Sequence, residues 1–70
     1  MTDVPIRGDS IRLGQLLKLA GLADSGGEAK QLLAAGLVSV NGEVELRRGR
    51  QLTAGDRVAV DADEVTVVKA

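Results

Sequence analysis

The 70-residue sequence lacks cysteine, histidine and every aromatic residue. Without cysteine, the chain can form neither a disulfide nor a thiolate ligand for a metal. Without histidine, it can build neither a Cys/His zinc site nor a nucleophile–histidine pair. The core must therefore consist of aliphatic side chains, mainly Leu and Val. A chain of this length forms one domain, which buries only about 60% of the surface that its unfolded form exposes.

Long apolar runs and an excess of one charge are also missing. The longest apolar run is far shorter than a membrane span, and the N-terminus has no apolar signal core. We therefore expect a soluble, cytoplasmic protein. The net charge is −1, which by itself argues against strong binding to nucleic acid. However, three arginines lie within the stretch RRGR (47–50), so a local basic patch can form on a chain that is neutral overall.

The first half of the sequence predicts two short helices joined by a tight turn. Apolar residues recur at helical spacing from Leu13 to Ala20, with Ser10 as a plausible N-cap and Gly21 where a helix ends. This pattern predicts a first helix of about three turns. Its outer face would carry Gly14, Gln15 and Lys18.

The second helix begins within the stretch DSGGEAK (24–30). Ser25 and Glu28 have the spacing of a capping box, in which each side chain bonds the backbone amide of the other residue. The helix would turn Ala29, Leu32 and Leu33 inward and end at Gly36. Two explanations for Gly26 and Gly27 remain open: close packing of the turn, or an anion held against bare backbone amides.

Period-two patterns predict a small sheet. Residues 4–6 would form an edge strand, because Pro5 cannot donate to a central ladder. Asn41-Gly42 predicts a two-residue hairpin between strands at 37–40 and 43–45. Two more strands, 57–60 and 65–68, would follow a basic loop (46–51) and a turn (53–56). The fold class is α+β, with two packed short helices and a mostly antiparallel sheet of about four to five short strands.

The hairpin contains a conflict. A two-residue turn puts Val38 and Val40 on one face with Glu43 and Glu45, and Val44 on the other. Either both faces are partly covered or the hairpin carries a bulge.

Catalytic constellations are missing. The carboxylates are scattered, and no base is placed to activate a serine, so we expect no enzyme, no cofactor and no metal site. Gly21-x4-Gly26 begins like a phosphate-binding Walker loop, but Gly27 stands where its lysine is required and no strand precedes it.

Two stretches could bind anions. One is the start of the second helix, with Gly26, Gly27 and Lys30. The other is the RRGR loop with Gly49 as its hinge, although a charged run is often only solvated surface. Three arginines without interleaved acids repel one another, and guanidinium groups suit phosphate oxygens. If the two stretches adjoin, they form one surface.

Residues 11–60, IRLGQLLKLAGLADSGGEAKQLLAAGLVSVNGEVELRRGRQLTAGDRVAV, resemble the RNA-binding domain named after ribosomal protein S-four. The motifs that carry this likeness are LxxLLKLAG, SGGEAK, AAGLVSVNG, ExRRGRxL and LxxGDxVxV. The resemblance is strongest to the small stand-alone YbcJ-like bacterial branch. Many family members have an arginine where this chain has Gly26, so one charge of the usual contact surface is absent.

The resemblance implies that residues 1–70 form one domain, with its core in residues 11–60, that binds structured RNA. The partner would be ribosomal or transfer RNA, including RNA within a ribosomal particle. Because no aromatic residue can stack on bases, recognition would read phosphates, 2′-hydroxyls and helical shape. The RNA-binding residues would be Arg12, Lys18, Ser25, Gly26, Gly27, Lys30, Gln31, Arg47, Arg48 and Arg50.

Two other functional classes remain as alternatives. A protein-interaction module without an RNA role could use the exposed sheet edge and aliphatic surface. A ubiquitin-like sulfur carrier shares the VNGE hairpin and the LxxGDxVxV pattern. Such carriers need a C-terminal Gly-Gly, however, and this sequence ends VVKA (67–70).

Overall fold

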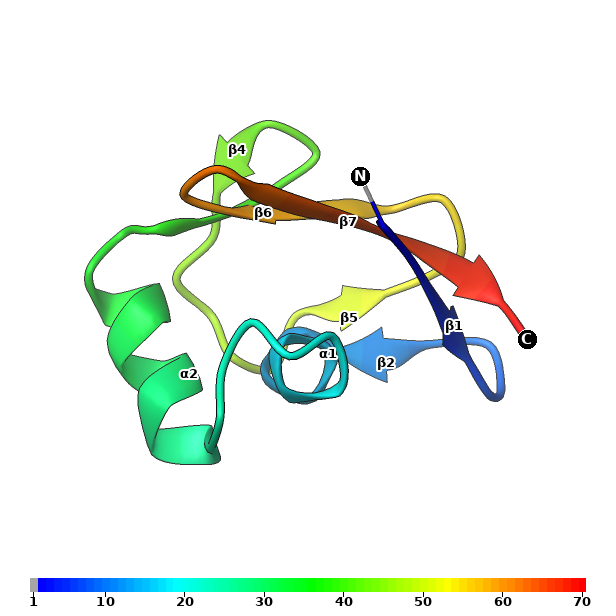
Figure 1. Cartoon of the computed structure of the whole chain (residues 1–70), viewed down its shortest axis with the longest axis horizontal. Helices are drawn as coiled ribbons and strands as arrows, with labels where there is room; N and C mark the ends of the chain where they lie inside the picture. Colours follow the sequence, from blue (N-terminus) through cyan, green and yellow to red (C-terminus); the bar gives the residue numbers. More distant parts are fainter. Residues whose placement is uncertain (1) are drawn as a thin grey trace.

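The protein is an α+β domain in which one face of a sheet covers two helices (Figure 1). The computed structural model describes residues 2–70, and Met1 lies outside the described residues. Within that range, no helix combines the length and the apolar character needed to cross a bilayer. The elements are β1 (Thr2–Ile6), β2 (Ile11–Arg12), α1 (Leu13–Leu19), α2 (Gly26–Ala34), β3 (Val38–Val40), β4 (Glu43–Val44), β5 (Gln51–Leu52), β6 (Arg57–Val60) and β7 (Asp63–Lys69).

The main sheet has five strands in the order β1-β7-β6-β3-β4. Strand β1 is parallel to β7, and the other pairs are antiparallel. The predicted edge position of β1 is confirmed, as is the α+β class. The sequence patterns missed a second sheet, in which β2 pairs antiparallel with β5. Its strands are only two residues long, too short for an alternating pattern to be recognised.

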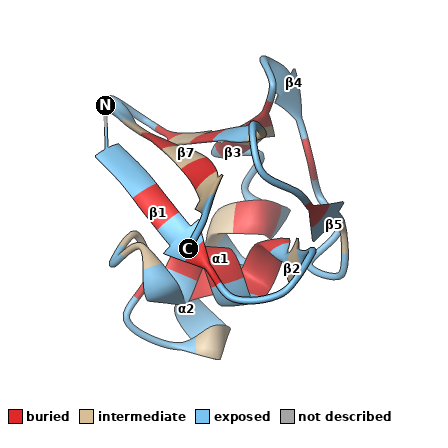
Figure 2. Cartoon of the chain, turned by 90° about the vertical axis from the view of Figure 1, so that its right-hand side faces the viewer, coloured by how far each residue is buried: buried red, intermediate tan, exposed pale blue. Residues whose placement is uncertain are grey.

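The core lies between the sheet and the helices, and Figure 2 shows buried positions alternating with exposed ones along β1. Leu13, Leu16 and Leu17 of α1 are completely buried, as are Val38, Val58 and Val67 of the sheet. Burying such a side chain contributes about 1.5–3 kcal/mol. Helix α1 therefore packs against the sheet with one face, and its opposite face, which carries Gln15 and Lys18, is exposed.

The start of α1 differs from the sequence prediction. The helix begins at Leu13 and has seven residues, so the expected three turns are wrong, and so is Ser10 as N-cap. The N-cap position is Arg12, whose side chain makes no capping bond. Instead, the amides of Leu13 and Gly14 donate to the carbonyls of Arg50 (2.8 Å) and Arg48 (3.0 Å). A loop distant in sequence thus satisfies the amides that a side chain was expected to cap.

Both helices end as predicted. Gly21 and Gly36 have φ of 75° and 74°, a left-handed conformation that glycine adopts without steric cost. The amides of Leu22 and Gly21 donate to the carbonyls of Leu17 and Lys18, and the same pair of bonds closes α2. This is the Schellman arrangement.

The hairpin conflict is resolved without a bulge. Asn41 and Gly42 have φ of 53° and 88° and form the two-residue turn, with Val40 paired to Glu43 and Ser39 to Val44. The regular pairing continues, because the Glu45 amide donates to the Val38 carbonyl (3.0 Å). Glu43 stays exposed at the edge of the sheet, whereas Glu45 is 7% exposed beside the core.

Candidate functional site

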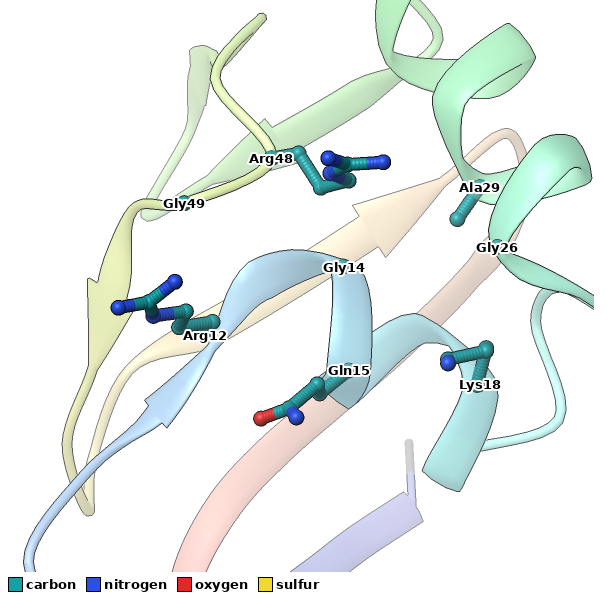
Figure 3. A pocket seen from close by; sticks show the side chains of 8 residues that line it. All are labelled: Arg12, Gly14, Gln15, Lys18, Gly26, Ala29, Arg48 and Gly49. Atoms are coloured by element: carbon teal, nitrogen blue, oxygen red, sulfur yellow. The ribbon is translucent and has the colours of Figure 1, made fainter.

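A pocket of about 430 Å³ lies between α1, the start of α2 and the loop after β4. Three cationic side chains line it: Arg12 at the end of β2, Lys18 of α1 and Arg48 of the loop (Figure 3). No carboxylate of residues 2–70 lines this pocket, so its charge is uniformly positive. Its lining is completed by Gly14, Gln15, Gly26, Ala29 and Gly49.

Arg48 lies across the first turn of α1, directly over Gly14. A Cβ atom at position 14 would stand only 2.5 Å from the Arg48 Cγ and 3.1 Å from its Cδ. Figure 3 shows the Arg48 guanidinium extended over Gly14 toward α2. The expectation that Gly14 is on the outer face is wrong in one respect: Gly14 is buried, because the Arg48 side chain covers it.

The start of α2 is capped on one side only. The Ser25 hydroxyl oxygen accepts from the Glu28 amide (3.1 Å), which confirms half of the predicted capping box. The reciprocal bond from the Ser25 amide to the Glu28 carboxylate is absent from the hydrogen bonds of residues 2–70. The Gly26 and Gly27 amides also have no acceptor within this part of the chain. These amides lie at the positive end of the helix dipole, where an anion is favoured.

The structure argues against one of the two explanations for this glycine pair, namely close packing of the turn. A Cβ atom at Gly26 would meet nothing within 4 Å, and one at Gly27 would meet only the Ser25 hydroxyl oxygen at 3.8 Å. Neither residue is among those of positive φ. Close packing of the turn therefore does not require these glycines. The open space over Gly26 belongs to the pocket.

An acid just before the RRGR loop, Glu45, pairs with two of its three arginines. The Glu45 carboxylate accepts from the Arg47 backbone amide (3.0 Å), from the Arg47 Nε and Nη2 (3.2 Å each) and from the Arg50 Nη1 (3.1 Å). These bonds, led by that from the Arg47 side chain, lower the pKa of Glu45 to about 2. No acid is interleaved among these arginines, as the sequence shows, but an acid that precedes them compensates two of the three charges. The sequence signal for this contact was the position of Glu45 on the same strand face as Val38, which places its carboxylate near the core.

The three loop arginines consequently differ in their surroundings. Arg47 and Arg50 both pair with Glu45, although 78% of the Arg47 side chain remains exposed. The ion pairs within residues 2–70 engage one further cation, Lys69. Four predicted site residues thus carry a positive charge without an ion pair in this range: Arg12, Lys18, Lys30 and Arg48.

The structure sorts the predicted site residues into three groups. Arg12, Lys18, Gly26 and Arg48 line the pocket. Arg47 and Arg50 stand beside it in the loop, held by Glu45. The third group is exposed at the start and outer face of α2 without lining the pocket: Ser25, Gly27, Lys30 and Gln31. Sequence reasoning did not single out Gln15 as a pocket residue, although its place one turn before Lys18 was a usable signal.

The arrangement has the chemistry of an anion site rather than of a metal site. Guanidinium groups, an ammonium group and unpaired amides all donate hydrogen bonds, and none of them can ligate a cation. Within residues 2–70, no three acidic side chains gather closely enough to hold a metal ion.

Fold and site together define a small α+β domain with a cationic surface built from two helices and a hairpin loop. The sequence model of the S4 domain matches residues 4–68, and the chain belongs to this family. It is 47% identical over 58 residues to the Bacillus subtilis (strain 168) protein named "Probable ribosome maturation protein RlbA", covering 83% of this chain and 82% of that one. It is 41% identical to YbcJ of Escherichia coli (strain K12), covering 83% of both chains.

Two further similarities concern larger proteins. The tyrosine–tRNA ligase of Moorella thermoacetica is 38% identical over 65 residues, which cover 81% of this chain and 16% of the ligase. The crystal structure of ribosomal protein S4e from Thermoplasma acidophilum superposes with a TM-score of 0.62 at 24% identity, over 81% of this chain and 30% of that one. This last similarity shows the fold alone.

Proposed function

We propose that this protein is a non-catalytic RNA-binding domain that holds structured RNA at the pocket and along the adjoining start of α2. One observation carries the proposal: Arg12, Lys18 and Arg48 line, together with Gly26, one pocket that no carboxylate of residues 2–70 lines. The net charge of −1 does not exclude binding to RNA, because the attraction of a polyanion depends on the local electrostatic field at the binding surface.

The contacts would be made mainly to the sugar–phosphate backbone. Arg48 can donate two parallel hydrogen bonds to one phosphate, whereas Lys18 acts as a point charge. The Gly26 and Gly27 amides can approach a second phosphate, because no side chain covers them. Since the chain has no aromatic residue, bases cannot be stacked, and the domain would distinguish RNA by helical shape and 2′-hydroxyls.

Ribosomal RNA is the partner we favour. RlbA is named for ribosome maturation, and YbcJ is named provisionally as an RNA-binding protein. Both are matched over more than four-fifths of their own length, so the likeness covers nearly the whole protein. The tRNA ligase is matched over only 16% of its length, which makes transfer RNA the second choice. A ribosomal partner would place the protein in the cytoplasm.

The proposal is tested by fluorescence anisotropy with labelled ribosomal RNA hairpins, a transfer RNA and a single-stranded oligouridine. We expect the hairpins to bind best and the oligouridine worst. A triple variant with Arg12, Lys18 and Arg48 changed to Ala should lose at least about 100-fold in affinity, at about 1 kcal/mol or more for each contact to a charged group. The matched control is Arg57→Ala, which removes an exposed arginine of β6 outside the pocket. Equal binding by the triple variant and the control would overturn the proposal.

The protein-interaction alternative has one observation in its favour. Val44 and Leu46 are 64% and 61% exposed on the β4 side of the hairpin, at the edge of the sheet. Absence of binding to every RNA at low salt would support this alternative. The sulfur-carrier alternative lacks comparable support, because the family model that matches residues 4–68 is that of the S4 domain.

A further inference from the structure

Glu45 is the one polar or charged residue among the buried residues of the described chain. It is held in place by the sheet, because its amide donates to Val38 at the end of the β3–β4 pairing. Its carboxylate accepts four hydrogen bonds from Arg47 and Arg50, so both of its oxygens are engaged. A buried carboxylate of this kind is costly unless it is fully paired, as it is here.

The loop is fastened at a second place. The carbonyls of Arg48 and Arg50 accept from the first two amides of α1. Arg50 thus takes part in both fastenings, through its side chain to Glu45 and through its carbonyl to Leu13. Arg48 lies between Arg47 and Arg50 in the loop. Its carbonyl accepts from the Gly14 amide, and its side chain forms no ion pair in the described range.

We propose that Glu45 is a positioning residue of the RNA site: by holding Arg47 and Arg50 it fixes the loop so that Arg48 extends over Gly14 into the pocket. This inference rests on the proposed function. It also assigns unequal roles to three arginines that are alike in sequence. Arg48 is the principal phosphate-binding side chain of the loop, and Arg47 and Arg50 mainly hold its conformation.

The proposal and simple electrostatics predict opposite effects. If Glu45 only reduced the positive charge of the loop, its removal would strengthen binding to a polyanion. If Glu45 positions Arg48, its removal frees two mutually repelling arginines and weakens binding, although the net charge becomes more positive. The sign of the effect therefore separates the two roles.

The test compares Glu45→Gln with Glu43→Gln, a matched control that removes the same charge from an exposed residue two positions away. We expect Glu45→Gln to weaken binding of the ribosomal RNA hairpin at least about fivefold, within the range of measured coupling between contacting residues. Glu43→Gln should bind as tightly as the wild type or more tightly. If Glu45→Gln binds at least as tightly as Glu43→Gln, the positioning role is overturned.

A second variant keeps the test decisive if Glu45→Gln is poorly folded. Glu45→Asp retains the charge but withdraws the carboxylate by one methylene, and thermal unfolding would verify that it is folded during the assay. We expect it to weaken binding at unchanged net charge, whereas wild-type affinity would overturn the proposal. In the Glu45→Gln background, Arg48→Ala should cost at least about threefold less affinity than in the wild type.

Failure of the two proposals can be told apart. If the wild type binds none of the RNAs, the proposed function fails and the positioning role fails with it. If the wild type binds and Glu45→Gln binds more tightly, only the positioning role fails. Backbone 15N relaxation of residues 46–50 in the free protein gives a readout without RNA, and we expect faster motion in Glu45→Gln. Unchanged loop motion would overturn the positioning role.

Discussion

The aliphatic part of Arg48 lies on the backbone of Gly14, and the Gly14 amide donates to the Arg48 carbonyl at 3.0 Å. This contact joins the hairpin loop to the first turn of α1, so two segments that are distant in sequence form one side of the pocket. It also explains a glycine at the second position of a helix, where its conformational freedom carries an entropic cost. Gly14 is required because the arginine occupies the place of its side chain.

Gly14→Ala should therefore reduce RNA binding while leaving the fold intact. The new methyl group would stand 2.5 Å from the Arg48 Cγ and displace that side chain from α1. Stability should change by less than about 1 kcal/mol, because the gain in helix propensity offsets the strain. Affinity should fall about as far as in Arg48→Ala, measured by anisotropy alongside thermal unfolding. Wild-type affinity of a folded Gly14→Ala would show that the position of Arg48 is unimportant.

At Gly26 we expect a substitution by alanine to raise stability and to weaken RNA binding. Because a Cβ atom there meets nothing within 4 Å and φ is not positive, alanine fits the folded chain without strain. Gly26→Ala should raise stability by about 0.5 kcal/mol, which corresponds to roughly 2–4 °C in the unfolding midpoint of a domain this small. It should also weaken RNA binding, since the methyl group covers an amide at the pocket.

The control for Gly26→Ala is Ala34→Gly at the other end of α2, where the side chain is exposed and distant from the pocket. This change should lower stability by roughly 0.5–1 kcal/mol and leave RNA affinity unchanged. A Gly26→Ala protein that is less stable than the wild type would contradict the account of this glycine. A Gly26→Ala protein that binds RNA as tightly as the wild type would show that Gly26 does not contact the RNA.

Acid should weaken the fold through Glu45. Its folded-state pKa of about 2 lies below the ordinary value of 4.5, so its contribution is fully present above about pH 4.5. The contribution is lost as the pH falls from about 4.5 toward 2, because protonation ends the pairing with Arg47 and Arg50. Urea unfolding of the wild type and Glu45→Gln at several pH values should show a stability difference that is constant at neutral pH and shrinks below pH 4.5.

Some acid dependence should remain in Glu45→Gln. The pKa of Asp56 is also lowered, first by the hydrogen bond from the Thr53 amide and then by that from the Asn41 side chain. Asp56 therefore also contributes stability that is lost as the pH falls. A stability difference between wild type and Glu45→Gln that stays constant down to pH 2 would contradict the pairing described for Glu45.

Local rules account for much of this fold, and contacts between distant segments account for what they miss. The caps at Ser25, Gly21 and Gly36 and the turn at Asn41-Gly42 each depend on a few neighbouring residues, so the sequence predicts them correctly. Ser10 fails as a cap because the Arg48 and Arg50 carbonyls already bind the start of α1. No local pattern contains that information.

The candidate site divides in the same way. The cationic residues were recognisable by type, and Arg12, Lys18 and Arg48 do meet at one pocket. The different surroundings of Arg47, Arg48 and Arg50 were not predictable, because they depend on which side chains reach Glu45 and which reach Gly14. The hairpin pattern placed Glu45 on the same face as Val38 and Val40, but it could not show that Arg47 and Arg50 pair with its carboxylate there.

Salt dependence measures how many of the proposed phosphate contacts form. Four predicted site cations carry no ion pair within residues 2–70, so the slope of log K against log salt should be roughly −3.5 for the wild type. Lys18→Ala should make this slope shallower by about 1 and weaken binding to all structured RNAs alike, because a phosphate contact carries no sequence information. Arg57→Ala should leave the slope unchanged, since this residue lies outside the pocket. A wild-type slope near zero would mean that RNA, if bound, is not held by its phosphates, and the pocket would then lose its assigned role.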